Sequence, residues 1–321
     1  MVKIIPYASA YLASYQDFAR RNWGKNCYQQ SEKYLDWLYR ANPYKDPDRP
    51  FLIAVQEQTV VGALHKMRLP WLIDGQKTTV SAIHNLLVDP QYRQGSGLLL
   101  ITASFQNESQ VLCPGVLPPL SEAYKMLRCQ EIDALWFRKI IAPVGAVAEK
   151  ICKLPLPPRE KRKTSARLID TPGTAQIETM AAKLNQGAGN HILWDAEIFQ
   201  WRFLQGPRHI FLVEDADNFL ILSVGRRKGL TVARIIDGRV ENEHSPLWTD
   251  ALIAARSRGA AVLLAYSAET RLKKYLTAHT KPLKKHPLVF FQHRDRRARE
   301  MSFNGSAGDF GFEGLLTRRF S

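Results

Sequence analysis

A glycine-containing turn between an apolar strand and a helix is the part of this 321-residue chain best suited to chemistry. Residues 86–101 read Leu-Leu-Val-Asp-Pro-Gln-Tyr-Arg-Gln-Gly-Ser-Gly-Leu-Leu-Leu-Ile. Pro90 ends the strand, and Gly95 and Gly97 remove side chains where the backbone must turn tightly or approach a ligand. A helix start of this kind presents N–H groups and the positive end of the helix dipole, and Arg93 adds a fixed charge. The turn therefore predicts an anion site, most often a phosphate site; the alternative is an ordinary strand-to-helix turn.

This loop resembles the acetyl-coenzyme A motif of the GNAT acetyltransferase superfamily, in which a strand ending in Val leads into x-Pro-x-Tyr-Arg-Gly-x-Gly-x-Gly and a leucine-rich helix. The matching residues are Val88, Pro90, Tyr92, Arg93, Gly95, Gly97 and the leucines that follow. The chain departs from the motif by being one residue short after Arg93, which puts Leu99 where the family has a small residue. The resemblance implies that an acyl-coenzyme A, expected to be acetyl-coenzyme A, is a co-substrate. It would contact Leu86, Leu87, Val88, Arg93, Gln94, Gly95, Ser96, Gly97 and Leu98.

The resemblance also implies where a thioester would react. In this superfamily, backbone N–H groups near the end of the strand polarise the thioester carbonyl, and those positions here are Leu87 and Val88. The Glu that the family often carries four residues before the Val corresponds to His84, whose neutral imidazole can accept a proton near pH 7. Strand alternation predicts that His84 shares a face with Leu86 and Val88. The alternative is a half-buried strand histidine that is bonded to a backbone carbonyl.

A second catalytic candidate follows from the same resemblance. The segment 121–127 partly matches the family's Ala-x-x-Tyr-x-x-Leu-Gly-Phe region, so Tyr124 would be the phenol beside the coenzyme sulfur and act as the acid. The family's Gly-Phe is replaced by Arg128-Cys129. The alternative is that Tyr124 is an aromatic residue on the inner face of a helix.

The chain repeats one order of elements. Segments 34–43 and 198–207 each carry a Trp, an aromatic residue two positions later and a Pro six positions later. The first copy then predicts strands at 51–55, 60–64 and 78–88, a helix at 97–107 and a strand at 111–112. The second predicts strands at 210–213, 219–224 and 231–237, a helix at 246–258 and a strand at 260–265. We therefore expect an internal duplication.

The expected fold class is α+β, with two tandem GNAT-like domains, each a mixed, mostly antiparallel sheet flanked by helices. The proline-rich segment 154–158 and the basic run after it read as a linker. This gives an N-terminal domain with the acetyl-coenzyme A loop at 1–157, a linker at 158–166 and a degenerate domain at 167–321. The second copy has no paired glycine before its helix, and the position matching Tyr124 is near Leu272. We expect it to bind no coenzyme A and to form a wall of the acceptor cleft or a purely structural partner.

Composition limits the partners and the compartment. The net charge of +15 favours anionic partners, although solvated surface residues explain most of it equally well. Nucleic acid is not expected, because the basic clusters lack interleaved aromatic residues. The four cysteines lie far apart, so neither a disulfide framework nor a metal site is expected. With no long apolar run and no leader-like N-terminus, the sequence predicts a cytoplasmic protein without a membrane span.

These features predict an acyl-coenzyme A-dependent N-acyltransferase, specifically an N-acetyltransferase, that acts on an amine of a sugar, peptide or small metabolite. Two alternatives stay open. One is a catalytically inactive GNAT-like binding protein, and the other is an aminoacyl-tRNA-dependent transferase of the peptidoglycan-bridge type. The sequence leaves the acceptor, the acyl chain length and the oligomeric state open.

Overall fold

The computed structural model describes residues 1–25, 27–143, 164–186, 189–206, 209–227, 230–293 and 301–307. Two compact units make up this part of the chain. Unit 1 contains Met1–Ile132 and the described residues from 287 to 293, and unit 2 contains the described residues from 133 to 286 and 301–307. Most of the expected linker, 158–166, lies outside the described residues, so the expected domain limits stay a prediction.

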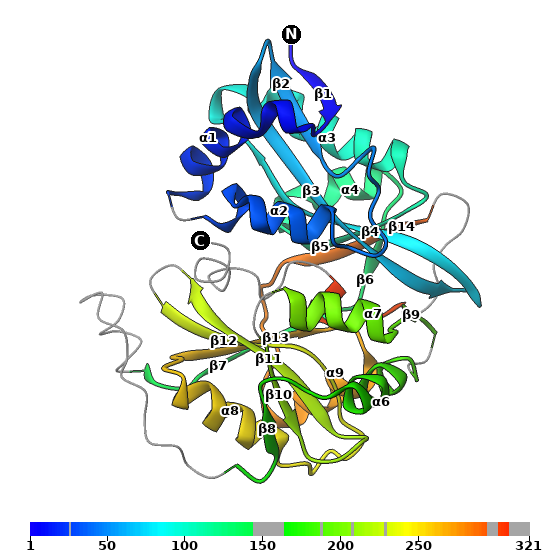
Figure 1. Ribbon diagram of the computed structural model, residues 1–321, viewed down its shortest axis with the longest axis vertical. Helices are drawn as coiled ribbons and strands as arrows, with labels where there is room; N and C mark the ends of the chain where they lie inside the picture. Colours follow the sequence, from blue (N-terminus) through cyan, green and yellow to red (C-terminus); the bar gives the residue numbers. More distant parts are fainter. Residues whose placement is uncertain are drawn as a thin grey trace. The chain divides into compact units, whose positions relative to one another are not determined.

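Unit 1 is built on one mixed sheet (Figure 1). Its strands are β1 (Lys3–Pro6), β2 (Leu52–Gln56), β3 (Thr59–Ile73), β4 (Gln76–Val88), β5 (Gln110–Val116), β6 (Gln130–Ile132) and β14 (Leu288–His293). They lie in the order β1-β2-β3-β4-β5-β14-β6, and of these neighbours β4 and β5 are the parallel pair. The long β3–β4 hairpin closes at Asp74 and Gly75, both with positive φ, as a two-residue Asp-Gly loop requires.

The helices of unit 1 cover both faces of this sheet. They are α1 (Leu12–Trp23), α2 (Glu32–Tyr39), α3 (Arg93–Asn107) and α4 (Ser121–Met126), with short turns η1 (Ser9–Tyr11), η2 (Tyr28–Gln30), η3 (Pro90–Tyr92) and η4 (Pro118–Leu120). One face packs α3 and α4 in a hydrophobic core that includes Leu100, Phe105 and Tyr124. The other face packs α1 and α2 around a fully buried histidine, His65 of β3, with aromatic rings on several sides.

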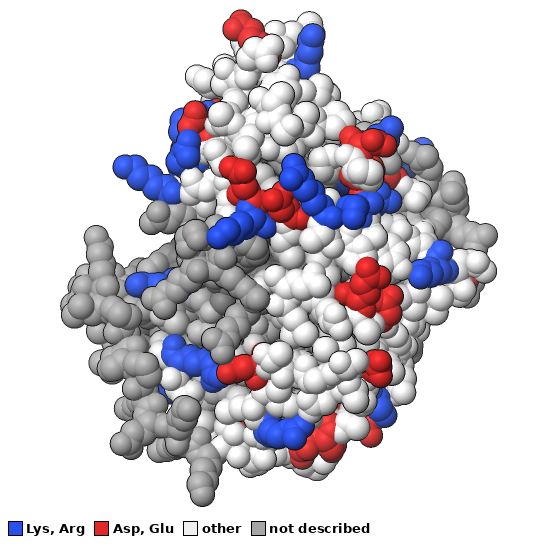
Figure 2. Space-filling view, viewed as in Figure 1, with Lys and Arg blue, Asp and Glu red and all other residues white. Residues whose placement is uncertain are grey.

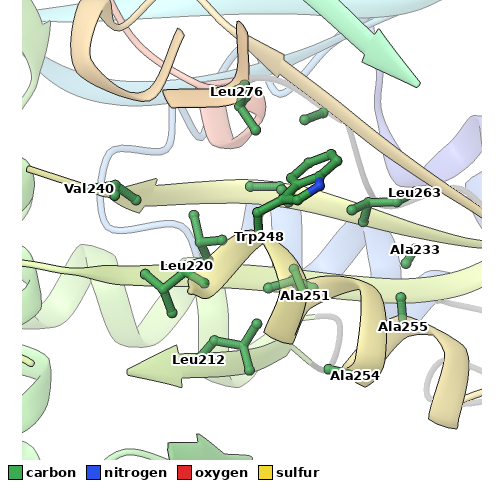
Figure 3. Close-up of a cluster of buried hydrophobic side chains, with 14 of the residues drawn as sticks. Leu212, Leu220, Ala233, Val240, Trp248, Ala251, Ala254, Ala255, Leu263 and Leu276 are labelled. Carbon is green, nitrogen blue, oxygen red and sulfur yellow. The ribbon is translucent and has the colours of Figure 1, made fainter. Parts of the chain in front are cut away.

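Unit 2 has a six-stranded sheet in the order β7-β13-β12-β11-β10-β8. Its strands are β7 (Leu135–Ile140), β8 (Arg167–Ile169), β10 (His209–Val213), β11 (Phe219–Arg227), β12 (Leu230–Arg239) and β13 (Val262–Ser267), and β9 (Asn190–Ile192) pairs with β15 (Met301–Ser302) apart from it. The helices are α6 (Thr174–Leu184), α7 (Ala196–Phe199), the π-helical η5 (Gln200–Gln205), α8 (Leu247–Ser257), α9 (Thr270–His279) and η6 (Gly305–Ala307). Figure 3 shows how Ala251, Ala254 and Ala255 let α8 approach the sheet, while Trp248 fills the remaining space.

The two sheets follow one plan, which confirms the predicted α+β fold and its duplication. Strands β1 to β5 and helix α3 correspond in order to β8, β10 to β13 and helix α8. Each sheet is also completed by a strand from the other half of the sequence, since β14 lies beside β5 and β7 lies beside β13. The sequence did not predict this exchange, because a strand pattern does not name the strand's partner.

No helix in the described part of the chain is both long and apolar enough to cross a membrane. Charged side chains of both signs are interspersed on the face seen in Figure 2. In unit 1, for example, Asp46 lies 3.6 Å from the Lys66 ammonium and 3.1 Å from the Arg68 guanidinium.

Candidate functional site

The parallel pair of strands in unit 1 separates halfway along. Its ladder consists of two register pairs, Ser81 with Val111 and Ala82 with Leu112. Strand β4 continues for six more residues, 83–88, while it stays paired with β3 on its other edge. Within the described residues, the β5-facing edge of this segment therefore has no ladder partner, and we call this unpaired part of the boundary between β4 and β5 the gap.

A β-bulge lies within this separated part of β4. The register with β3 shifts by one residue between Leu87, opposite Ala63, and His84, opposite His65. Asn85 takes a left-handed conformation there, with φ of 52°, which Asn tolerates better than most residues. Its side-chain amide donates to the Tyr28 hydroxyl at 3.3 Å, so it also ties the bulge to η2.

The bulge corrects one prediction about His84. Leu86 and Val88 pack in the core on the α3 face, whereas the His84 ring lies 5.8 Å from the His65 ring on the α1 and α2 face. The prediction that His84 shares a face with Leu86 and Val88 is therefore wrong, because the extra residue resets the alternation of side chains.

The glycine turn leaves space in front of the helix. Gln94 (ψ 91°) and Gly95 (φ 88°) are not helical, so the regular part of α3 starts after them. A Cβ added at Gly95 or Gly97 would meet no atom within 4 Å. Ser96 is buried, whereas Leu98 is half exposed. The first amides of the helix can thus be approached by an anion, and the residues present fit a phosphate group.

One hydrogen bond closes this turn, and two more fix it to α1. The Arg93 Nε donates to the Val88 carbonyl at 3.2 Å. The Asp89 carboxylate accepts from Asn22 Nδ2 at 2.5 Å and from the Arg21 guanidinium at 3.1 Å, both at the end of α1. Sequence reasoning missed Asp89, although its position between a strand and a proline is typical of an anchoring residue at a turn.

Tyr124 lies on α4 and is almost entirely buried. Its ring stacks on Phe290 of β14, with centroids 5.5 Å apart, and meets Phe105 edge-on at 6.3 Å. Burial raises the pKa of its phenol well above the usual value, and the thiols of Cys113 and Cys129 raise it further. The group therefore keeps its proton at neutral pH, which is the state that a proton donor needs.

At Arg128-Cys129 the residue types differ from the Gly-Phe of the resembling motif, but the backbone of Arg128 takes a conformation that glycine adopts easily. Arg128 has φ of 60°, the left-handed conformation that Gly usually supplies after a helix. Cys129 is buried in the same core as Tyr124.

His84 and Tyr124 lie on opposite faces of one sheet. His84 belongs to the α1 and α2 face and Tyr124 to the α3 and α4 face. A molecule in the gap between β4 and β5 could reach both faces, because no strand ladder separates them there.

The structure also shows where the remaining residues singled out in the sequence lie. The position expected to match Tyr124 in the second copy, Leu272, is a buried residue of α9. Cys27, Cys113 and Cys129 are free thiols, and Cys152 lies outside the described residues. Within the described residues, no three His, Cys, Asp or Glu side chains gather as a metal site would require.

No protein-family model matches the chain, and no curated protein matches it in sequence. Solved structures do share its fold. Saccharomyces cerevisiae N-myristoyltransferase with bound myristoyl-CoA is 11% identical, with a TM-score of 0.63 over 94% of this chain and 84% of that one. A putative acetyltransferase from Pyrococcus horikoshii is 9% identical, with a TM-score of 0.60 over 97% and 95%. A GCN5-related N-acetyltransferase from Kribbella flavida is 17% identical, with a TM-score of 0.53 over 92% and 72%.

These likenesses extend over both halves of the chain. The chain therefore has the GNAT fold, built twice in tandem.

Proposed function

We propose that this chain is an acyl-coenzyme A-dependent N-acyltransferase whose reaction takes place in unit 1. The observation that carries the proposal is the combination of a gap between β4 and β5 with an open glycine turn at its mouth. The first offers backbone hydrogen bonds to an extended arm, and the second offers amides to a pyrophosphate. One of the proteins of similar fold is an N-myristoyltransferase with bound myristoyl-CoA.

The co-substrate would be held by backbone groups more than by side chains. Amides of Gln94, Gly95, Ser96, Gly97 and Leu98 would receive the pyrophosphate, with Arg93 beside them as a cation. The pantetheine arm would lie along Leu86, Leu87 and Val88, and the amides of Leu87 and Val88 would polarise the thioester carbonyl.

The chemistry requires one bond to form and one to break. The amine nitrogen of the acceptor attacks the thioester carbon, so that a C–N bond replaces the C–S bond. The acceptor starts as an ammonium and loses two protons on its way to an amide. His84 takes these two protons in turn and passes each to solvent, while Tyr124 gives its proton to the leaving sulfur and regains one from solvent, so that one proton is released overall.

A short acyl group, acetyl above all, is our proposal for the transferred group. Ala82 and Leu112 close the gap at its narrow end and are both buried. On the face next to it, Tyr15, Phe51 and His65 are fully buried and in ring contact with one another. A long chain would have to displace this aromatic packing. The acceptor amine, on a sugar, peptide or small metabolite, would have to reach His84, whose side chain is buried.

The test is a pair of matched glycine substitutions. Gly97→Ala adds a methyl group where no atom lies within 4 Å, so the fold should be kept while the methyl occupies the space of the phosphates. Gly173→Ala in unit 2 is the control, because its added methyl is equally unobstructed. Acetyl-coenzyme A at about 100 times Kd should stabilise the wild type and Gly173→Ala by about 2.7 kcal/mol, and Gly97→Ala by much less.

Two outcomes would contradict the proposal. If acetyl-coenzyme A does not raise the melting temperature of the wild type, or raises that of Gly97→Ala equally, the glycine turn is not the binding site. Stabilisation without acetyl transfer to any amine in a panel of amino sugars, peptides and polyamines would instead indicate a binding protein. Salt-sensitive binding of tRNA without an effect of coenzyme A would indicate the aminoacyl-tRNA-dependent reaction.

A further inference from the structure

A buried cluster of hydrogen bonds surrounds His65, the residue opposite His84 in the β3–β4 register. The His65 side chain is fully buried and its ring stacks on Phe51, with centroids 4.5 Å apart. Its Nε2 lies 2.7 Å from the hydroxyl of Tyr15 on α1, and its Nδ1 lies 2.8 Å from the hydroxyl of Tyr39 on α2. Both ring nitrogens of His65 are therefore engaged.

Counting hydrogens assigns the direction of each bond. The Tyr15 hydroxyl has one hydrogen, and it donates that hydrogen to the Gln29 carbonyl at 3.0 Å. Towards His65 the Tyr15 oxygen can then only accept, so His65 Nε2 carries a hydrogen. A neutral imidazole with hydrogen on Nε2 has a bare Nδ1, which accepts from the Tyr39 hydroxyl. The four groups thus form one consistent chain: Tyr39 donates to His65, His65 to Tyr15, and Tyr15 to Gln29.

This arrangement opposes the protonation of His65. A second ring hydrogen would have to enter at Nδ1, so the Tyr39 hydroxyl would have to turn from donor to acceptor, and the charge would arise inside an aromatic cluster. Burial lowers the pKa of the His65 imidazole well below its usual value, and the neighbouring His84 lowers it further.

We propose that Tyr15 and Tyr39 are positioning residues that hold His65 neutral, so that His84 is the member of the histidine pair that takes up the acceptor's proton. This inference rests on the proposed function, in which His84 is the base. A neutral neighbour matters because a charged His65, at a ring distance of 5.8 Å, would repel a proton arriving at His84.

The other titratable groups around the pair are uncharged in their protonated forms. They come from each element packed on this face and are Tyr7, Tyr15, Cys27, Tyr28, Tyr34 and Tyr39. Burial raises the pKa of Tyr7, Tyr15 and Cys27. Charged groups act at the rim of the cluster, where Glu32, Arg40 and Asp36 influence Tyr7 and Arg20 influences Cys27.

The first experiment needs no substitution. Histidine ring nitrogens and carbons of the full-length chain, labelled with ¹⁵N and ¹³C, are followed by NMR from pH 5 to pH 8. We expect His65 to keep its hydrogen on Nε2 and not to titrate, while His84 does. A titrating His65, or one with hydrogen on Nδ1, overturns the inference whatever the activity of the enzyme.

The second experiment joins the cluster to the reaction. Tyr39→Phe removes the donor to Nδ1 and should allow His65 to compete for the proton, which shifts the acid limb of the pH profile of kcat/KM by about half a unit or more. Tyr44→Phe, which removes a partly exposed hydroxyl elsewhere in unit 1, should leave the profile unchanged. An unchanged profile for Tyr39→Phe contradicts the inference. If no transfer is found at all, the proposed function fails, and the titration of the wild type still decides whether His84 is the protonated member.

Discussion

Each of the two large sheets contains one parallel strand pair at the corresponding place, β4 with β5 in unit 1 and β12 with β13 in unit 2. The first pair shares two register positions and then separates. The second shares four, from Val232 with Val262 to Ile235 with Ala265, before it separates as well. Both β4 and β12 carry a β-bulge at the corresponding point. The register pair Leu87–Ala63 of unit 1 corresponds to the register pair Asp237–Ile221 of unit 2.

In unit 2, segment 301–307 lies beside the corresponding parts of β12 and β13, where Asp237, Phe303 and Asn304 also line a cavity. The Phe303 carbonyl accepts from the amide of Ala268 at 2.8 Å, just after β13. The Asp237 carboxylate on β12 accepts from Asn304 Nδ2 at 2.7 Å and from the Ser306 hydroxyl. Segment 301–307 is thus hydrogen-bonded to both strands, in the position that the pantetheine arm would take in unit 1. This supports the prediction that unit 2 binds no coenzyme A.

The side chains that would do chemistry differ in the same way. By the register, Ser223 and Arg234 of unit 2 stand where unit 1 has His65 and His84. Arginine stays protonated at all ordinary pH values, so it cannot serve as a base. The two units keep the same order of strands. Unit 2 has Ser223 and Arg234 in place of the two histidines, and segment 301–307 packs along its separated strands.

Among the variants that test this difference between unit 1 and unit 2, the largest effect is expected from His84→Ala. Removing the general base should lower kcat by about 100-fold or more. The affinity for acetyl-coenzyme A should stay the same, because the proposed binding groups are backbone amides of the turn and of the end of β4. Steady-state kinetics and calorimetric titration measure the two quantities separately. Full turnover in this variant would remove His84 from the mechanism.

A smaller loss is expected from Tyr124→Phe. The ring and its stacking on Phe290 are kept, and only the proton donor to the leaving sulfur is lost, so kcat should fall by about 10-fold. The loss should be larger for thioesters with a more basic thiol as leaving group, since these need the proton most. An equal rate with all thioesters, at the wild-type level, would make Tyr124 a packing residue.

The sequence was sufficient to predict most of the strands and helices and part of the candidate site. The strands of both hairpins, the helix after the glycine turn and the repeat itself were predictable, because apolar alternation and turn residues are local signals. The face of His84 was not, since one left-handed residue, Asn85, reverses the alternation after it. The hydrogen bonds of Tyr15 and Tyr39 with His65 could not be predicted either. These residues lie far apart in the chain and meet only after α1 and α2 pack on the sheet.

The smallest effect concerns the occupied gap of unit 2. Burial raises the pKa of Asp237 to about 6, against the opposing hydrogen bonds from Ser306, Asn304 and the Gly238 amide. The folded state therefore binds a proton more tightly than the unfolded state, whose carboxyl titrates near 4, and stability falls as pH rises between these values. For this group the loss between pH 5 and pH 7 is about 1 kcal/mol.

Asp237→Asn should remove that part of the pH dependence and keep the fold, because the Ser306 hydroxyl can turn to accept from the new amide. Denaturant unfolding of both proteins at pH 5 and pH 7 measures the difference. Acyl transfer should be the same in both, since the substitution touches only the gap that segment 301–307 fills. A loss of transfer activity with unchanged stability would mean that the gap in unit 2, and not only the one in unit 1, takes part in the reaction.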